Sequence, residues 1–146
     1  MMGNERFTLR SAAYLILLKN SKILLLKRKN TGWMDGYYSL IAGHLEEGEK
    51  VAETMSREAE EEAGIRIEPS CLRVVHVMHR KSNVEYIDFF LTADSWEGEI
   101  VNREPYKCEE LAWFSLNNLP KNTVPHVREA VRSYQNKTFF SENNWS

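Results

Sequence analysis

Cysteine is scarce in this chain of 146 residues, neither sign of charge is in large excess, and no apolar run is long. Cys71 and Cys108 are too few for a disulfide framework or a zinc site, so we expect two reduced thiols. The net charge of −2 argues against a stable nucleic acid partner. Residues 12–18 are too few to cross a bilayer, and the first ten residues lack a signal-peptide core. We therefore expect a cytoplasmic protein with no membrane partner.

The residues that are present predict one folded domain. Hydrophobic residues make up 42% of the chain, which is enough for a single core. We expect one domain over residues 1–146, with its core at about 7–136. Residues 7–18 and 23–26 predict a β-hairpin, further strands are expected at 37–42, 72–79, 86–93 and 112–114, and helices at 50–63 and 125–134. This mixture predicts a mixed α/β layered domain.

Acidic residues crowd onto the helix expected at residues 50–63, which Gly64 would close at its C-terminal end. One side of this helix is an apolar stripe made of Ala52, Met55, Ala59 and Ala63. Glu58, Glu61 and Glu62 fall together on an arc beside that stripe. Bound Mg²⁺ or Mn²⁺ would relieve their repulsion, because these ions prefer carboxylate oxygens. The spacing of these glutamates is also compatible with an acidic helix face that is exposed to water and binds no metal ion.

The segment GHLEEGEKVAETMSREAEEEAGI, residues 43–65, resembles the signature of the Nudix hydrolases at every defined position. The matching residues are Gly43, Glu49, Arg57, Glu58, Ala59, Glu61, Glu62, Gly64 and Ile65, of which only Ala59 is small for its place. The resemblance implies an α/β/α sandwich with a mixed β-sheet and a catalytic helix. It also implies a hydrolase that uses Mg²⁺ or Mn²⁺ to cleave a nucleoside diphosphate linked to another group.

The resemblance also assigns roles to residues of this segment. Glu58, Glu61 and Glu62 would bind the metal ion, with the carbonyl group of Gly43 or its neighbour as a further ligand. Arg57 would pair with Glu49 and orient helix and loop, although a surface pair with Glu53 is the alternative. Which glutamate deprotonates the attacking water stays open. The implied catalytic residues are Glu49, Arg57, Glu58 and Glu61, with Glu104 from a later loop.

Glu104 enters this set through a second resemblance. The stretch WEGEIVNREP, residues 96–105, is similar to a loop of the MutT-like branch of the family. In that branch a glutamate at the place of Glu104 reaches the metal site. Glu109 and Glu110 are competitors for the same role, and a water-exposed loop residue is the alternative.

Substrate markers of the family lie outside the signature. Where ADP-ribose and diadenosine-polyphosphate enzymes often carry proline and tyrosine, this chain has Arg80 and Ser82. The MutT-like loop therefore favours a (deoxy)nucleoside triphosphate pyrophosphohydrolase, which releases a nucleoside monophosphate and pyrophosphate and whose substrates include oxidised nucleotides. Hydrolysis of ADP-ribose or an NDP-sugar is the first alternative. A non-catalytic nucleotide-binding module is the second.

Recognition of a small nucleotide would need further side chains. By the resemblance Asn122 could read a base edge, Tyr38 is an aromatic residue available for stacking, and His44 adjoins the signature. His126, at the start of the last helix, is expected at the surface. The family includes homodimers, so a homodimer is compatible with the resemblance.

Overall fold

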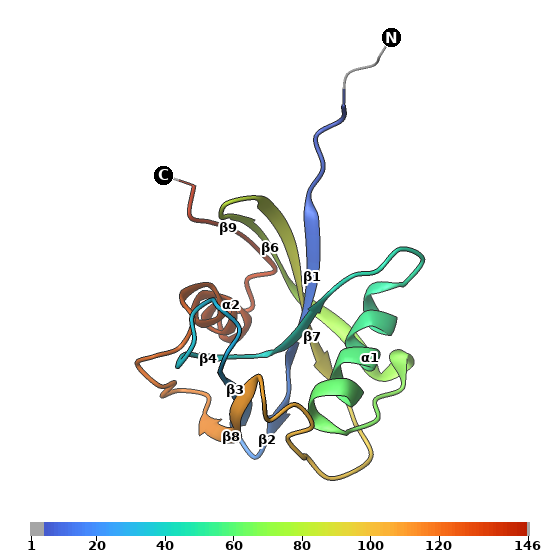
Figure 1. Ribbon diagram of the computed structural model, residues 1–146, viewed down its shortest axis with the longest axis vertical. Helices are drawn as coiled ribbons and strands as arrows, with labels where there is room; N and C mark the ends of the chain where they lie inside the picture. Colours follow the sequence, from blue (N-terminus) through green and yellow to red (C-terminus); the bar gives the residue numbers. More distant parts are fainter. Residues whose placement is uncertain (1–4, 146) are drawn as a thin grey trace.

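The computed structural model describes residues 5–145, in which two β-sheets lie between two helices (Figure 1). The strands are β1 (Arg10–Ile16), β2 (Leu18–Lys19), β3 (Lys22–Arg28), β4 (Tyr38–Ser39), β5 (Ile41–His44), β6 (Leu72–Lys81), β7 (Glu85–Ala93), β8 (Cys108–Ser115) and β9 (Phe140–Asn143). The helices are α1 (Val51–Ala63) and α2 (Pro125–Gln135), with a 3₁₀ turn η1 (Pro69–Cys71). The mixed α/β class is confirmed.

The larger sheet has the strand order β5-β1-β7-β6-β9. Its β1–β7 and β6–β9 pairs are parallel, whereas β1–β5 and β6–β7 are antiparallel. The smaller sheet joins β2, β3 and β4, and β8 pairs with the other edge of β3. The mixed sheet expected from the family resemblance is therefore present.

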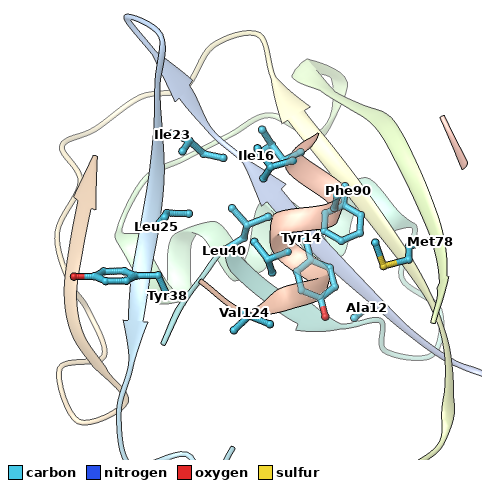
Figure 2. Packing of buried hydrophobic residues seen from close by; sticks show 13 residues of the cluster. Ala12, Tyr14, Ile16, Ile23, Leu25, Tyr38, Leu40, Met78, Phe90 and Val124 are labelled. Atoms are coloured by element: carbon cyan, nitrogen blue, oxygen red, sulfur yellow. The ribbon is translucent and has the colours of Figure 1, made fainter. Parts of the chain in front are cut away.

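Alternate residues of β1 point into two separate cores. Ala12, Tyr14 and Ile16 belong to the cluster that includes Val127 and Val131 of α2 (Figure 2). Ala13, Leu15 and Leu17 belong to the cluster that includes Met55, Ala59 and Ala63 of α1. Because successive side chains of a strand point to opposite faces, one helix covers each side. This is the expected α/β/α sandwich, with α1 and α2 on opposite sides of the strands (Figure 1).

The expected hairpin is only partly correct. β2 and β3 pair with each other, with Leu18 opposite Ile23. β1 instead lies between β5 and β7 in the larger sheet. The physical reason is that β1 is apolar on both faces, as is typical of a central strand with neighbours at both edges.

β9 follows the core that we expect at about residues 7–136. The strand adds to β6 in parallel, with Val77 opposite Phe140. The buried His76 ring forms two hydrogen bonds with this segment. His76 Nδ1 lies 2.7 Å from the carbonyl oxygen of Thr138, and His76 Nε2 lies 2.8 Å from Ser141 Oγ. These long-range contacts stabilise a segment whose own sequence has little strand character.

The helix α1 begins and ends as its sequence predicts. Lys50 is the N-cap, and its backbone N–H donates to the Glu53 carboxylate at 2.8 Å. Gly64 has φ of 70°, the left-handed conformation that closes many helices. Met55, Ala59 and Ala63 are fully buried, whereas Ala52 is only half-buried. Within residues 5–145, neither helix is long and apolar enough to span a bilayer.

Candidate active site

A large cleft has a volume of about 1010 Å³. Its lining includes the acidic residues Glu58, Glu61, Glu62 and Glu104. It also includes aromatic and basic residues, among them Trp33, Arg80 and His126. The volume is at the upper end of ordinary ligand sites, so the cleft has room for an extended ligand.

The glutamates of α1 gather beside Gly43 at the end region of β5. The Glu58 side chain is only 12% exposed, and a Cβ added at Gly43 would collide with its carboxylate. Burial, with the charge of Glu61, raises the pKa of Glu58 to about 7. Burial, with the charges of Glu58 and Glu104, raises the pKa of Glu62 well above its usual value. The glycine thus permits a close approach that concentrates negative charge.

Arg57 lies beside this acidic group and makes the expected pair with Glu49. Its Nε atom is 2.7 Å from Glu49 Oε2, and its Nη2 atom donates to Glu49 Oε1 at 3.0 Å. The hydroxyl group of the buried Thr54 also donates to Glu49, at 2.7 Å. These hydrogen bonds, that of Arg57 first, lower the pKa of Glu49 to about 2. Glu53 caps the helix instead, so the alternative partner of Arg57 is not used.

Glu104 also lines the cleft, from the loop before β8. Asn102 holds this loop, since its Oδ1 accepts from the N–H of Glu104 at 3.1 Å and its Nδ2 donates to the Cys108 carbonyl at 2.7 Å. The competitors have other partners. Glu109 pairs with Lys27 at 3.4 Å, and Glu110 accepts the hydrogen bond of the Tyr38 hydroxyl at 2.7 Å.

The donor chemistry of this part of the cleft fits a hard divalent cation. Four carboxylates line this part of the cleft, and burial, followed by the charges of neighbouring glutamates, raises the pKa of Glu58 and of Glu62. A divalent cation would compensate this charge, and oxygen ligands suit Mg²⁺ and Mn²⁺. Within residues 5–145 no three ligating side chains are already drawn together into a metal-binding group.

The residues expected to bind substrate fall into two groups. His44 lines the cleft, and its ring centroid lies 6.0 Å from that of Tyr86. Tyr38 and Asn122 do not line it. The Tyr38 hydroxyl is bonded to Glu110 and points toward β8, away from Tyr14 (Figure 2). The Asn122 amide donates to the Gly36 carbonyl at 2.8 Å and joins two loops.

Sequence reasoning missed a polar network that lines the cleft. Arg80 donates to the fully buried Asp88 at 2.6 Å, and its Nη2 lies 3.5 Å from the Tyr14 hydroxyl. That hydroxyl lies 3.1 Å from His126 Nε2. The expectation that His126 is at the surface was wrong, because the residue is 6% exposed. A charged residue within each of two apolar strands, Arg80 and Asp88, was the available signal.

Comparisons with known proteins agree with this geometry. The family model described as NUDIX domain matches residues 8–134. A relative from Methanocaldococcus jannaschii, named ADP-ribose pyrophosphatase, is 37% identical over 77% of this chain and 66% of its own length. A relative from Stutzerimonas stutzeri, named NAD-capped RNA hydrolase NudC, is 30% identical over 90% of this chain but only 45% of its own. The chain thus spans less than two thirds of these curated relatives.

Solved structures give the same answer for the fold. A structure titled MutT NUDIX hydrolase from Burkholderia pseudomallei has a TM-score of 0.78 and 27% identity, and the match covers 86% of this chain and 97% of that one. A MutT protein from Methanosarcina mazei has a TM-score of 0.77 at 17% identity, covering 92% and 98% of the two chains, and shows the fold alone. With the domain match over most of its length, the signature at residues 43–65 and the sandwich around α1, the chain belongs to the Nudix family.

Proposed function

We propose that this protein is a metal-dependent hydrolase that cleaves a phosphoric anhydride bond in a nucleoside diphosphate-linked substrate. The observation that carries the proposal is the gathering of Glu58, Glu61, Glu62 and Glu104 in the lining of a cleft with room for an extended nucleotide. A diphosphate is strongly anionic, so it could not enter this acidic region without cations. The relatives named as pyrophosphatase and capped-RNA hydrolase support the same class of reaction.

Several residues of the chain have defined tasks in this reaction. The four glutamates and the carbonyl group of Gly43 would hold Mg²⁺ or Mn²⁺. When bound, such an ion neutralises phosphate charge and lowers the pKa of a water molecule. Arg57 ties α1 to Glu49 of the preceding loop, which orients the carboxylates. Glu61, 49% exposed, and Glu104 are the side chains best placed to accept the proton of the attacking water.

Two substrate classes remain as candidates. The MutT-like loop around Glu104 and the MutT structural neighbour support a nucleoside triphosphate, oxidised nucleotides included, with release of pyrophosphate. The relative from Methanocaldococcus jannaschii supports ADP-ribose. Many ADP-ribose enzymes carry a proline at the position of Arg80. Because this relative is named ADP-ribose pyrophosphatase, we do not take the missing proline as an argument against ADP-ribose as the substrate. A cytoplasmic location and a homodimer are parts of the proposal that need their own measurements.

The test is hydrolysis of a substrate panel by the purified protein with Mg²⁺, with Mn²⁺ and with a chelator. The panel contains nucleoside triphosphates, 8-oxo-dGTP, ADP-ribose, NAD and an NDP-sugar. Glu58→Gln is expected to lower metal-dependent turnover by about a hundredfold or more, because it removes a carboxylate that touches the cation. Glu60→Gln is the matched control, since Glu60 is on the same helix but exposed and outside the cleft lining.

Metal-dependent release of products from one class, lost in Glu58→Gln and kept in Glu60→Gln, would establish the activity and its substrate class. Equal turnover of both variants would contradict the proposed role of the acidic cluster. Binding of a nucleotide without turnover of any member of the panel would instead favour the nucleotide-binding module.

A further inference from the structure

The lining of the cleft also contains a histidine, His126, with one occupied and one open ring nitrogen. His126 Nε2 lies 3.1 Å from the Tyr14 hydroxyl. No hydrogen bond within residues 5–145 reaches His126 Nδ1, and this atom is not among the enclosed polar atoms that lack a partner. Because His126 lines the cleft, Nδ1 is available to a ligand there.

The neighbours of Tyr14 decide which nitrogen of His126 carries the proton. Arg80 can only donate, so the Tyr14 oxygen accepts from it. The Tyr14 side chain is buried, and among the described residues His126 is the one acceptor within reach of its O–H. Tyr14 therefore donates to Nε2, which leaves the proton of the neutral ring on Nδ1. Asp88, Arg80 and Tyr14 thus form a chain that orients His126 as a hydrogen-bond donor toward the cleft.

His126 also stays uncharged over the ordinary pH range. Its burial lowers its pKa to about 3, and the nearby charges of Arg80 and Arg28 act in the same direction. The neutral ring adds no positive charge of its own, so a phosphate nearby would be attracted by Arg28 and Arg80 and not by His126. The chemistry at Nδ1 therefore suits a carbonyl oxygen or an unprotonated ring nitrogen.

An aromatic surface lies next to this donor. The Trp33 ring centroid is 6.0 Å from that of His126, and 46% of Trp33 remains exposed at the cleft. Arg28 lies over the Trp33 ring at 4.9 Å and donates to the Trp33 carbonyl oxygen at 2.7 Å. The loop is held further by Asp35, which accepts from the Thr31 hydroxyl at 2.5 Å. Trp33 is thus fixed in place before a ligand arrives, which favours stacking of a planar group.

We propose that His126 and Trp33 form the nucleobase subsite, where Nδ1–H of His126 donates to an acceptor on the edge of an uncharged base beside the Trp33 ring. Tyr14, Arg80 and Asp88 are positioning residues that fix the tautomer. This inference rests on the proposed function, because it assigns the nucleoside part of that substrate to His126 and Trp33 in the same cleft.

The first test is the tautomer of His126, read by ¹⁵N NMR of the imidazole nitrogens in the intact protein. The expected spectrum has a protonated Nδ1 and an unprotonated Nε2 between pH 6 and 8. In Tyr14→Phe this preference should weaken, since Nε2 loses its donor. A wild-type ring protonated on Nε2, or one that is fully charged near neutral pH, would overturn the inference.

The second test compares two substitutions of His126 in kinetics and binding. His126→Phe keeps a ring but removes the donor, and it should raise KM about tenfold or more with a smaller change in kcat. His126→Asn places an amide N–H near the position of Nδ1 and should recover much of that loss. An unchanged KM in His126→Phe, with the protein folded, would overturn the assignment.

Binding alone separates this inference from the proposed hydrolysis. We would titrate AMP, GMP and ribose 5-phosphate by calorimetry in the presence of a chelator. The expected result is that His126→Phe weakens the nucleotides about tenfold and leaves ribose 5-phosphate unchanged. That pattern would support the subsite even if no substrate were hydrolysed. Equal weakening of all three ligands would overturn it, even for an active enzyme.

Discussion

Arg57 decides which carboxylates near the cleft are already compensated by a positive charge. Its guanidinium group contacts Glu49 at 2.7 Å, Glu61 at 3.3 Å and Glu58 at 3.4 Å. Glu62 and Glu104 have no ion-pair partner within the described part of the chain. The two carboxylates without a cation are therefore the ones that gain most from a bound metal ion.

Replacement of Glu104 tests this point, because it should lower metal-dependent turnover but raise the melting temperature of the metal-free protein. Glu104→Gln should lower metal-dependent turnover by about tenfold to a hundredfold, because it removes a carboxylate from the cluster. With a chelator it should raise the melting temperature, because it removes repulsion with Glu58 and Glu62. Glu109→Gln, which loses only an exposed pair with Lys27, should change both quantities little. A Glu104→Gln protein with wild-type turnover would contradict the placement of Glu104 at the metal site.

The residues of the site differ in how far the sequence could predict them. Glu58, Glu61 and Glu62 share one helix, so regular spacing predicts that they lie together. Tyr14 and His126 are 112 positions apart, and Arg80 is 66 positions from Tyr14. No local pattern places such residues side by side, since only the pairing of β1 with β7 and the packing of α2 bring them together. The same limit explains why the sequence suggested Asn122 and Tyr38 for substrate binding without indicating that their polar groups bond to Gly36 and Glu110.

At the scale of elements, the end of α1 holds the acidic residues in place. Glu61 and Glu62 lie in its last turn, directly before the cap at Gly64. The Gly64 N–H donates to the carbonyl oxygen of Glu60 at 3.0 Å. The backbone N–H of Arg103 donates to the Glu62 carbonyl at 3.2 Å, which joins the helix to the loop of Glu104. The geometry of this cap therefore affects two sides of the metal site.

Substitution of Gly64 by alanine should lower the free energy of unfolding by more than the cost of placing an alanine in the left-handed conformation. A left-handed residue other than glycine costs about 1–2 kcal/mol. In Gly64→Ala the added Cβ would also lie 2.9 Å from Arg103 Cδ. Gly32→Ala is the matched control, because Gly32 has φ of +85° but nothing within 4 Å. Urea unfolding should show a larger loss of unfolding free energy for Gly64→Ala, and equal losses would indicate that the Arg103 side chain moves without cost.

At the scale of the whole molecule, the fold brings two different chemistries into the lining of one cleft. The glutamates come from α1 and the loop before β8, whereas the neutral donor and the aromatic ring come from α2 and the loop after β3. The pattern of strands and helices predicts a mixed α/β layered domain, and the resemblance to the Nudix signature implies the sandwich. They do not predict the strand order or β9, because those depend on long-range pairing.

The free energy of unfolding should depend on pH, because His126 is buried in its neutral form in the folded protein. The folded pKa is about 3 and the ordinary value is 6.5, so between these pH values the unfolded chain binds a proton that the folded protein does not. Stability from this source is complete above about pH 6.5 and is lost as the pH falls, by about 1.4 kcal/mol per pH unit. The charged or titratable groups around the ring are Tyr14 on β1, Arg28 on β3 and Arg80 on β6.

A comparison of wild type with His126→Asn isolates this contribution. Urea unfolding from pH 4.5 to 7.5 in a chelator gives the free energy of unfolding of each protein. The carboxylate cluster and the Glu49 pair titrate in both proteins, so their contributions cancel in the difference between the two curves. The difference should be constant above pH 7 and should change by about 2–3 kcal/mol down to pH 4.5, because the asparagine variant has no proton to exclude. Parallel curves over the whole range would mean that His126 takes up its proton in the folded protein as it does in the unfolded chain.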